Sequence, residues 1–349
     1  MPFFNREKEV AGLKSILSGE PNVIWFVYGP INSGKTALIT KVLEELPDGY
    51  CVFYINFRGV ETRRYEDFVR ALFQPRDESF WEKLVKKADI IEAALDYGEK
   101  IIKKINHHFE VPTRVLKLLF QREPERDVFK YLEVLMKRLN DKGKKPVLIF
   151  DELQMLREVK KNGNVLYDLF NFLIRITKEI HLCHCLCATN DCLFIEDIYS
   201  NARLGGRANY FLVDDLSKEE AFKVYEGFGF REKDLIWEYI GGKLGDMVLF
   251  LEEKKLGFSE KEILKKMVKS TLNKLDWIRL TKIKKLEDGE SYLKFLKKFK
   301  NKEKMDKREV EKEFDKLIYW VKENVLFYNP LEGTVKTQSR LIFHAIKEL

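Results

Sequence analysis

A glycine-rich turn containing one lysine and one threonine lies near the start of the chain. Residues 29–36, Gly-Pro-Ile-Asn-Ser-Gly-Lys-Thr, match the pattern G-x-x-x-x-G-K-[ST], whose backbone surrounds phosphate groups. The apolar run 23–28 before the turn predicts a buried strand, and apolar residues recur at helical spacing after it. Because the pattern stands between a strand and a helix, we predict that the chain binds a nucleoside triphosphate.

Each residue type in this turn has a part in binding phosphate. Backbone N–H groups would point at the phosphate oxygens, assisted by the positive end of the following helix. Lys35 would place its charge between the β- and γ-phosphates, and Thr36 would offer its hydroxyl to Mg²⁺. The predicted nucleotide contacts are Gly29, Pro30, Ile31, Asn32, Ser33, Gly34, Lys35, Thr36 and Ala37.

An acidic pair ends a second apolar run, residues 146–152, in the manner of a Walker B strand. Asp151 would hold Mg²⁺ through its water shell, and Glu152 would polarise the attacking water. The alternative is that the pair only caps the next helix. A base beside the metal-holding aspartate favours hydrolysis of ATP over its storage.

Three cysteines alternate along residues 183–187, with two histidines nearby, and suggest a metal site. A spacing of two residues is strand periodicity, which places the thiols in a row on one face and not around a point. Structural zinc sites combine two separate ligand pairs, and this segment offers one. We therefore expect Cys183, Cys185 and Cys187 to be core residues of a strand.

Two further positions are candidates for contacts with the γ-phosphate. Thr189 and Asn190 end the cysteine-containing strand, and we prefer Asn190 as a polar sensor of the phosphate and the water. Arg207 could reach a phosphate across the site or across a subunit boundary, the alternative being a solvated surface arginine.

The composition predicts a folded protein of two or three domains. The 349 residues are 45% hydrophobic and 34% charged, and no apolar run approaches the length of a membrane helix. The first residues lack a basic and then apolar leader, so we expect a cytoplasmic location without membrane contact. Residues 254–349 hold 25 Lys and Arg against 15 Asp and Glu, which suggests an acidic partner or only solvated helix faces.

The patterns divide the chain into three parts. Residues 1–215 form the nucleotide domain, with a helical insertion at about 76–127, and residues 216–255 form a helical lid. Capping boxes at Ser217 and Ser259 start new helices. Residues 256–349 form a basic domain with helices over 259–285, 291–300 and 306–324 and a β-hairpin over 325–337. Helices followed by a hairpin are the order of a winged helix.

The chain resembles the archaeal ATPase family, a branch of the signal-transduction ATPases related to AAA+ proteins. The resemblance rests on residues 4–9, 29–36, 148–154, 204–207, 241–242 and 325–341. It implies an α/β fold with a parallel P-loop sheet of order 5-1-4-3-2, a helical lid and a C-terminal winged helix. It also implies that Phe4, Asn5 and Arg6 lie near the adenine and that Arg207 is the family's Gly-Arg element.

Three functions compete at this point. The first is an ATP-hydrolysing conformational switch, slow or stimulated by a protein partner or by self-association, that uses ATP and Mg²⁺. The second is an ATP-regulated DNA-binding protein that contacts DNA through residues 256–349. The third, a kinase of a small molecule, is disfavoured because Glu152 suits water activation better.

Overall fold

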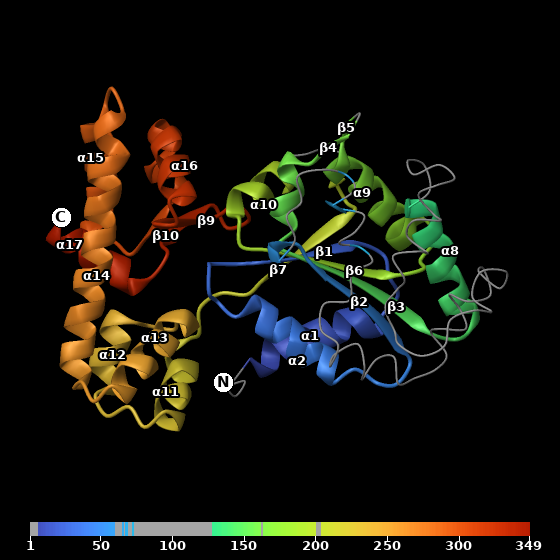
Figure 1. The fold of residues 1–349 in the computed structure, drawn as a ribbon, viewed down its shortest axis with the longest axis horizontal. Helices are drawn as coiled ribbons and strands as arrows, with labels where there is room; N and C mark the ends of the chain where they lie inside the picture. Colours follow the sequence, from blue (N-terminus) through green and yellow to red (C-terminus); the bar gives the residue numbers. More distant parts are fainter. Residues whose placement is uncertain are drawn as a thin grey trace.

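The computed structural model describes residues 6–59, 65, 67–68, 72, 128–161, 163–199 and 204–349. These residues form a lobe built around a parallel sheet and an elongated second lobe along the helix α14 (Glu260–Thr281) (Figure 1). The predicted insertion 76–127 and most of the predicted helix 64–74 lie outside the described residues.

Five parallel strands form the sheet in the order β2-β3-β6-β1-β7. Numbered along the chain as core strands 1 to 5, this is the predicted order 5-1-4-3-2, which is therefore confirmed. The central strands are apolar and covered on both faces, as parallel strands require. The strands are β1 (Ile24–Tyr28), β2 (Tyr50–Asn56), β3 (Lys145–Asp151), β6 (His184–Thr189) and β7 (Ala208–Leu212).

Helices cover both faces of this sheet (Figure 1). On one face α1 (Glu7–Ser18) and α2 (Lys35–Glu44) pack apolar side chains against the sheet. The opposite face is covered by α8 (Val128–Asp141), α9 (Val165–Ile174), which continues as a π-helical turn, and α10 (Cys192–Tyr199). The short strands β4 (Lys160–Lys161) and β5 (Gly163–Asn164) form a separate antiparallel pair.

The segment predicted as a lid has an apolar core of its own. It contains α11 (Lys218–Gly227), α12 (Lys233–Tyr239) and α13 (Leu244–Lys255), and the first half of α14 completes the core. The predicted capping boxes at Ser217 and Ser259 are both present, each serine accepting from the backbone N–H three residues later. The second half of α14 packs instead in the core of the C-terminal module, so this helix joins the two.

The C-terminal module contains a three-stranded antiparallel sheet of order β8-β10-β9. The predicted hairpin is present as the two strands β9 and β10, and β8 is an additional strand. Within the predicted helix 306–324, the α-helix spans only residues 314–322, because Asp306 caps a short 3₁₀ turn and a second 3₁₀ turn follows over residues 311–313. The elements of the C-terminal module that follow α14 are α15 (Gly289–Lys297), β8 (Lys304–Asp306), α16 (Phe314–Lys322), β9 (Leu326–Asn329), β10 (Thr334–Thr337) and α17 (Arg340–Glu348).

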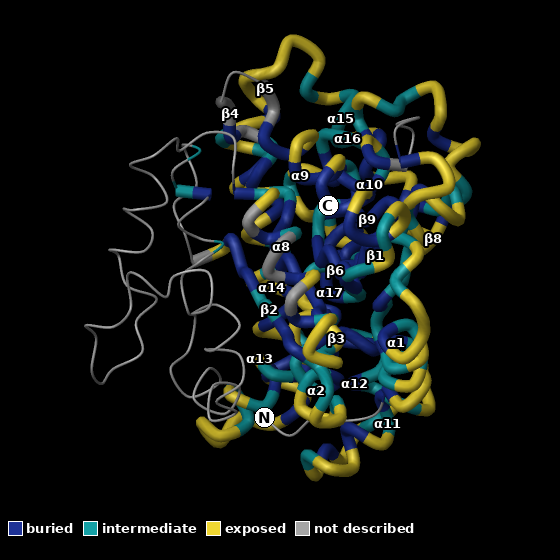
Figure 2. The backbone as a smooth tube through the Cα atoms, turned by 90° about the vertical axis from the view of Figure 1, so that its right-hand side faces the viewer, coloured by how far each residue is buried: buried dark blue, intermediate teal, exposed yellow. Residues whose placement is uncertain are grey.

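A continuous apolar core joins the C-terminal module to the ATPase sheet. Phe194 and Ile195 of α10 belong to the same buried cluster as Phe327 of β9 and Trp320 of α16. All four residues of β9 are buried, and Tyr28 at the end of β1 donates a hydrogen bond to Asn329 at 3.0 Å. Figure 2 shows buried backbone running through the centre of the molecule, with exposed residues on the outer helices. The hairpin is therefore an internal contact element of this fold.

Within the described ranges, every helix is too short or too polar to cross a bilayer.

The cysteine-containing strand has the predicted geometry. Cys183, Cys185 and Cys187 all lie in the buried cluster on one face of the sheet, and the alternating residues Leu186 and Ala188 lie in the cluster on the other. The three thiols are thus a row of small core side chains, as the spacing of two residues predicts.

We predict that all five thiols are inert in the native protein. All are buried, and burial raises the pKa of Cys51 and of Cys192 to about 12, so almost no thiolate forms at pH 8. A thiol reagent such as Ellman's reagent should react with none in the native state at pH 8 and with all of them in denaturant. Fast labelling of any thiol in the native protein would contradict this burial.

Candidate nucleotide-binding site

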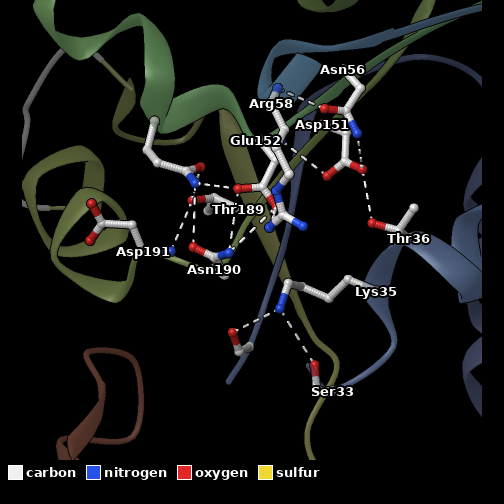
Figure 3. A network of polar contacts seen from close by, with 12 residues as sticks. Ser33, Lys35, Thr36, Asn56, Arg58, Asp151, Glu152, Thr189, Asn190 and Asp191 are labelled. Atoms are coloured by element: carbon white, nitrogen blue, oxygen red, sulfur yellow. Dashed lines mark hydrogen bonds and ion pairs between the residues drawn. The ribbon is translucent and has the colours of Figure 1, made fainter. Parts of the chain in front are cut away.

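The predicted phosphate loop connects β1 to α2 at the carboxyl edge of the sheet (Figure 3). Gly34 has φ 93°, a left-handed conformation that favours glycine. A side chain at Gly29 would meet the carbonyl oxygen of Val213 at 2.1 Å. Both glycines are therefore required by the geometry of the loop.

The Lys35 ammonium lies inside this loop. Its Nζ donates to the carbonyl oxygens of Gly29 at 3.0 Å and of Pro30 at 2.8 Å. The side chain is almost fully buried, and burial followed by the charge of Lys243 lowers its pKa to about 8. Lys35 is thus a cation held by weak carbonyl partners where phosphate oxygens would be stronger ones.

Thr36 and Asp151, the two predicted magnesium ligands, are in direct contact. The Thr36 hydroxyl donates to Asp151 Oδ2 at 2.9 Å, although the two residues are 115 positions apart in the sequence. Tyr54 and Asn56 of β2 donate to the same carboxylate oxygen at 2.6 Å and 3.2 Å and fix its orientation. A hydroxyl and a carboxylate side by side suit Mg²⁺, which takes few protein ligands and completes its shell with water and phosphate oxygens.

Glu152 follows directly and is held by three side chains. Arg58 Nη2 donates to its Oε1 at 2.6 Å and Gln154 Nε2 to its Oε2 at 2.7 Å, while Asn190 Nδ2 lies 3.3 Å from Oε2 (Figure 3). The backbone of Glu152 is left-handed, with φ 60° and ψ 40°, a costly conformation for a residue with a side chain. This conformation places Glu152 beside the Asp151 carboxylate, at the position predicted for the water-polarising residue.

Of the three residues expected near the adenine, Arg6 is described, whereas Phe4 and Asn5 lie outside the described residues. The buried Arg6 guanidinium donates to the carbonyl oxygens of Ser33 and of Asp214, each at 2.6 Å, and pairs with Glu9. Arg6 therefore supports the phosphate loop from outside.

The lid rests directly on the phosphate loop. Lys243 Nζ lies 3.2 Å from the carbonyl oxygen of Ile31 and 2.9 Å from Asp215. The backbone N–H of Gly245 donates to the Asn32 carbonyl, and a side chain at Gly245 would meet Asn32 Cβ at 2.6 Å. The N-terminal end of α13, from its N-cap Lys243 to Gly245, thus fits closely against residues 31–32.

The structure does not bring Arg207 to the phosphate loop. Its carbonyl accepts from the N–H of Ile24, at the start of β1, whereas the loop follows the end of that strand. The length of β1 separates the two, roughly 15 Å at the rise of a strand. Arg207 is exposed and lies at the opposite end of β1 from the phosphate loop, a position compatible with the predicted role at a subunit boundary and with the alternative of a solvated surface arginine.

Several residues of the site were not singled out from the sequence: Tyr54, Asn56, Arg58, Gln154, Asp215 and Lys243. A usable signal existed for some of them, because Asn56 and Asp215 follow core strands as Asp151 and Asn190 do. Arg58 and Lys243 carry no such signal. Their partners, Glu152 and Asp215, are distant in sequence and come near only in the fold.

A phosphate loop, a contacting threonine–aspartate pair and an adjacent glutamate on one edge of this parallel sheet define a P-loop ATPase site. The family model of ATPase domains predominantly from Archaea matches residues 3–250. A second family model, the C-terminal domain of MJ1010-like uncharacterized ATP-binding proteins, matches residues 261–349. The chain belongs to this archaeal ATPase family, which confirms the predicted resemblance.

Individual proteins agree with this assignment. The uncharacterized ATP-binding proteins MJ0075 and MJ1659 of Methanocaldococcus jannaschii are each 40% identical to the chain, covering all of it and 98% and 97% of their own lengths. Among solved structures, the Walker-type ATPase PABY2304 of Pyrococcus abyssi has a TM-score of 0.65 at 15% identity, over 99% of this chain and 96% of that one. The ORC2 protein of Aeropyrum pernix has a TM-score of 0.53 at 12% identity, over 100% and 95%. At these identities the structural likeness concerns the fold.

We predict that ATP affinity falls as pH rises above 8. Lys35 loses its proton near pH 8 in the ligand-free chain, whereas phosphate oxygens stabilise the ammonium in the complex, so the complex binds more protons. The dissociation constant should then rise by at most about tenfold per pH unit between pH 8 and 10.

Calorimetry in two buffers of different ionisation enthalpy should detect proton uptake on binding near pH 8. Lys35→Arg, whose side chain stays charged, should bind without this pH dependence. The same slope in wild type and variant would contradict the assignment to Lys35.

Proposed function

We propose that this chain hydrolyses ATP with Mg²⁺ and acts as a nucleotide-driven conformational switch. The observation that carries the proposal is the contact of Thr36 with Asp151, with Glu152 next to it on the same strand end. Thr36 and Asp151 would hold Mg²⁺, and the ion would neutralise charge on the phosphates when bound. Lys35 would leave its carbonyl partners for the phosphate oxygens.

Glu152 would accept the proton of the attacking water. Its carboxylate must first be released from Arg58, because that contact and those of Gln154 and Asn190 occupy both of its oxygens. Asn190 would then be free to contact the γ-phosphate or the water, the sensor role proposed for it. The need for this release supports a slow basal rate that a partner could stimulate.

The switch would act through the lid. The N-terminal end of α13 contacts the tip of the phosphate loop through Lys243 and Gly245, so a change in the loop would act on it directly. The lid core is separate from the sheet cores, and its main link to the C-terminal module is α14. Nucleotide occupancy would thus be converted into a change of lid position.

The DNA-binding hypothesis receives less support. The helix–strand–helix–hairpin order and the β8-β10-β9 sheet favour the winged-helix interpretation of the C-terminal module. In a winged helix that binds DNA the hairpin is a contact element, but here β9 is buried against α10. The likeness to ORC2 shows the fold alone. DNA contact through residues 256–349 would have to use the exposed lysines of the other faces.

We predict that Lys35→Ala and Glu152→Gln separate binding from hydrolysis. Loss of the Lys35 charge should weaken ATP binding by about 10- to 100-fold, the range for a lost charged hydrogen bond. Glu152→Gln should bind ATP normally and lower the turnover rate by about 10²- to 10⁴-fold. Fluorescent-nucleotide titration and phosphate release measure the two effects. Equal turnover by wild type and Glu152→Gln would remove Glu152 from the mechanism.

We predict that Arg58→Met raises the basal rate of hydrolysis. Its ion pair with Glu152 is exposed on the arginine side, so its removal should release the carboxylate at a gain of about two- to fivefold. Lys14→Met, which removes an exposed ion pair with Glu45 away from the cleft, is the matched control. A lower rate for Arg58→Met with an unchanged control would show that Arg58 assists the reaction instead.

The DNA hypothesis has its own test. If DNA binds residues 256–349, affinity should fall steeply with salt because bound counterions are released. Titration of the full chain with labelled duplex at two salt concentrations, with and without ATP, measures this. Salt-independent or absent binding would leave the switch as the remaining function.

A further inference from the structure

A cluster of four charged side chains lies between the phosphate loop, the lid and the C-terminal hairpin. Asp214 and Asp215 follow β7, Lys243 precedes α13, and Lys336 lies in β10. Lys243 pairs with Asp215 at 2.9 Å, and Lys336 pairs with Asp214 at 2.6 Å and lies 3.7 Å from Asp215. Three segments far apart in the sequence therefore meet at one acidic pair.

Lys243, Asp215 and Lys336 are largely shielded from solvent, whereas the Asp214 side chain is 43% exposed, and the cluster is tied to the phosphate loop. The Lys243 side chain is only 4% exposed, and its ammonium also contacts the Ile31 carbonyl of the loop. Arg6 fixes the other side, because its guanidinium joins the Ser33 carbonyl of the loop to the Asp214 carbonyl. Charges in such an environment interact more strongly than exposed ones.

The charge of Lys243 reaches the nucleotide site. The Lys243 Nζ lies 3.2 Å from the Ile31 carbonyl of the phosphate loop, so phosphates bound in this loop would attract Lys243 as well as Lys35. At the other end, burial opposes the charge of Lys336, but the carboxylates of Asp215 and Asp214 outweigh it and raise the pKa of this lysine. The Asp215 carboxylate thus lies between the ammonium groups of Lys243, beside the phosphate loop, and Lys336, in the hairpin.

We propose that Asp215 is a relay residue that couples the phosphates of a bound nucleoside triphosphate, through Lys243, to the C-terminal hairpin, through Lys336. Without nucleotide, Asp215 is engaged mainly by Lys243, the nearer of the two ammonium groups. Phosphates draw Lys243 away, and Asp215 then pairs fully with Lys336 and tightens β10 against the ATPase domain. The inference rests on the proposed function and names the path by which the switch reaches the C-terminal module.

Hydrogen–deuterium exchange of the β10 amides, residues 334–337, tests the relay. The experiment uses the full chain with Glu152→Gln, so that ATP stays intact. ATP should slow exchange at these amides by threefold or more in this parent, and the effect should vanish with Asp215→Asn while ATP still binds. Lys304→Met is the matched control. Lys304 lies opposite Lys336 in the register of β8 and β10, but its ion pair is an exposed one with Glu332. This control should keep the ATP effect.

A double-mutant cycle gives a second measurement, which also serves if Asp215→Asn does not fold. Lys243→Met and Lys336→Met should each change the ATP dissociation constant, and their combined effect should depart from the product of the two by threefold or more. Independent effects of the two substitutions would overturn the relay. So would bound ATP that leaves exchange of residues 334–337 unchanged in the parent. Failure of the parent to bind ATP would instead refute the proposed function on which the relay rests.

Discussion

The hydrogen bond between the Thr36 hydroxyl and the Asp151 carboxylate is the contact on which the site depends. Thr36 begins α2 after β1, and Asp151 ends β3, with β6 between these two strands. The contact forms because parallel strands present their carboxyl ends at one edge, where the loops that follow them converge. Tyr54 and Asn56 reach the same oxygen from the end of β2, so three side chains from two segments fix one carboxylate oxygen.

Around this contact, three charged side chains of the site have partners within the chain. Lys35 is bound by carbonyls of its own loop, Glu152 by Arg58, Gln154 and Asn190, and Lys243 by Asp215. Each of these groups would have to exchange its partner when a triphosphate and water enter. A site of this kind avoids unpaired buried charge, and the cost of exchanging partners would become part of the barrier to the proposed hydrolysis.

The C-terminal module is a structural part of the fold and not an appended tail. Its apolar core is continuous with the core beneath the ATPase sheet, through α10 and β9. Its net positive charge therefore resides on outer faces, while the hairpin is used for internal packing. Together with the two ion pairs of Lys336, this packing places the hairpin where it can respond to the nucleotide site.

Local patterns in the sequence were sufficient to predict most of the strands and helices and the nucleotide-binding motifs. Three kinds of pattern depend only on residues that are near one another in the sequence, so they can be recognised without the fold. They are the glycine spacing in residues 29–36, the apolar runs ending in Asp-Glu or Thr-Asn, and the capping boxes at Ser217 and Ser259. The strand order 5-1-4-3-2 came from the family resemblance, and the structure confirms it. Residues 306–324 show where prediction from local patterns fails. The cap at Asp306 was predicted correctly, but the length of the helix after it was not.

The ion pairs between residues distant in sequence could be identified only from the three-dimensional structure. The Arg58–Glu152 pair spans 94 residues, and Lys336 reaches Asp214 across 122 residues. Periodicity carries no information about such pairs, because any surface lysine or arginine has the same local pattern. The same reason explains Arg207, which has a motif-like neighbourhood but lies at the opposite end of β1 from the phosphate loop. Residue type specified what each group can do, and the order of the strands specified which groups can do it together.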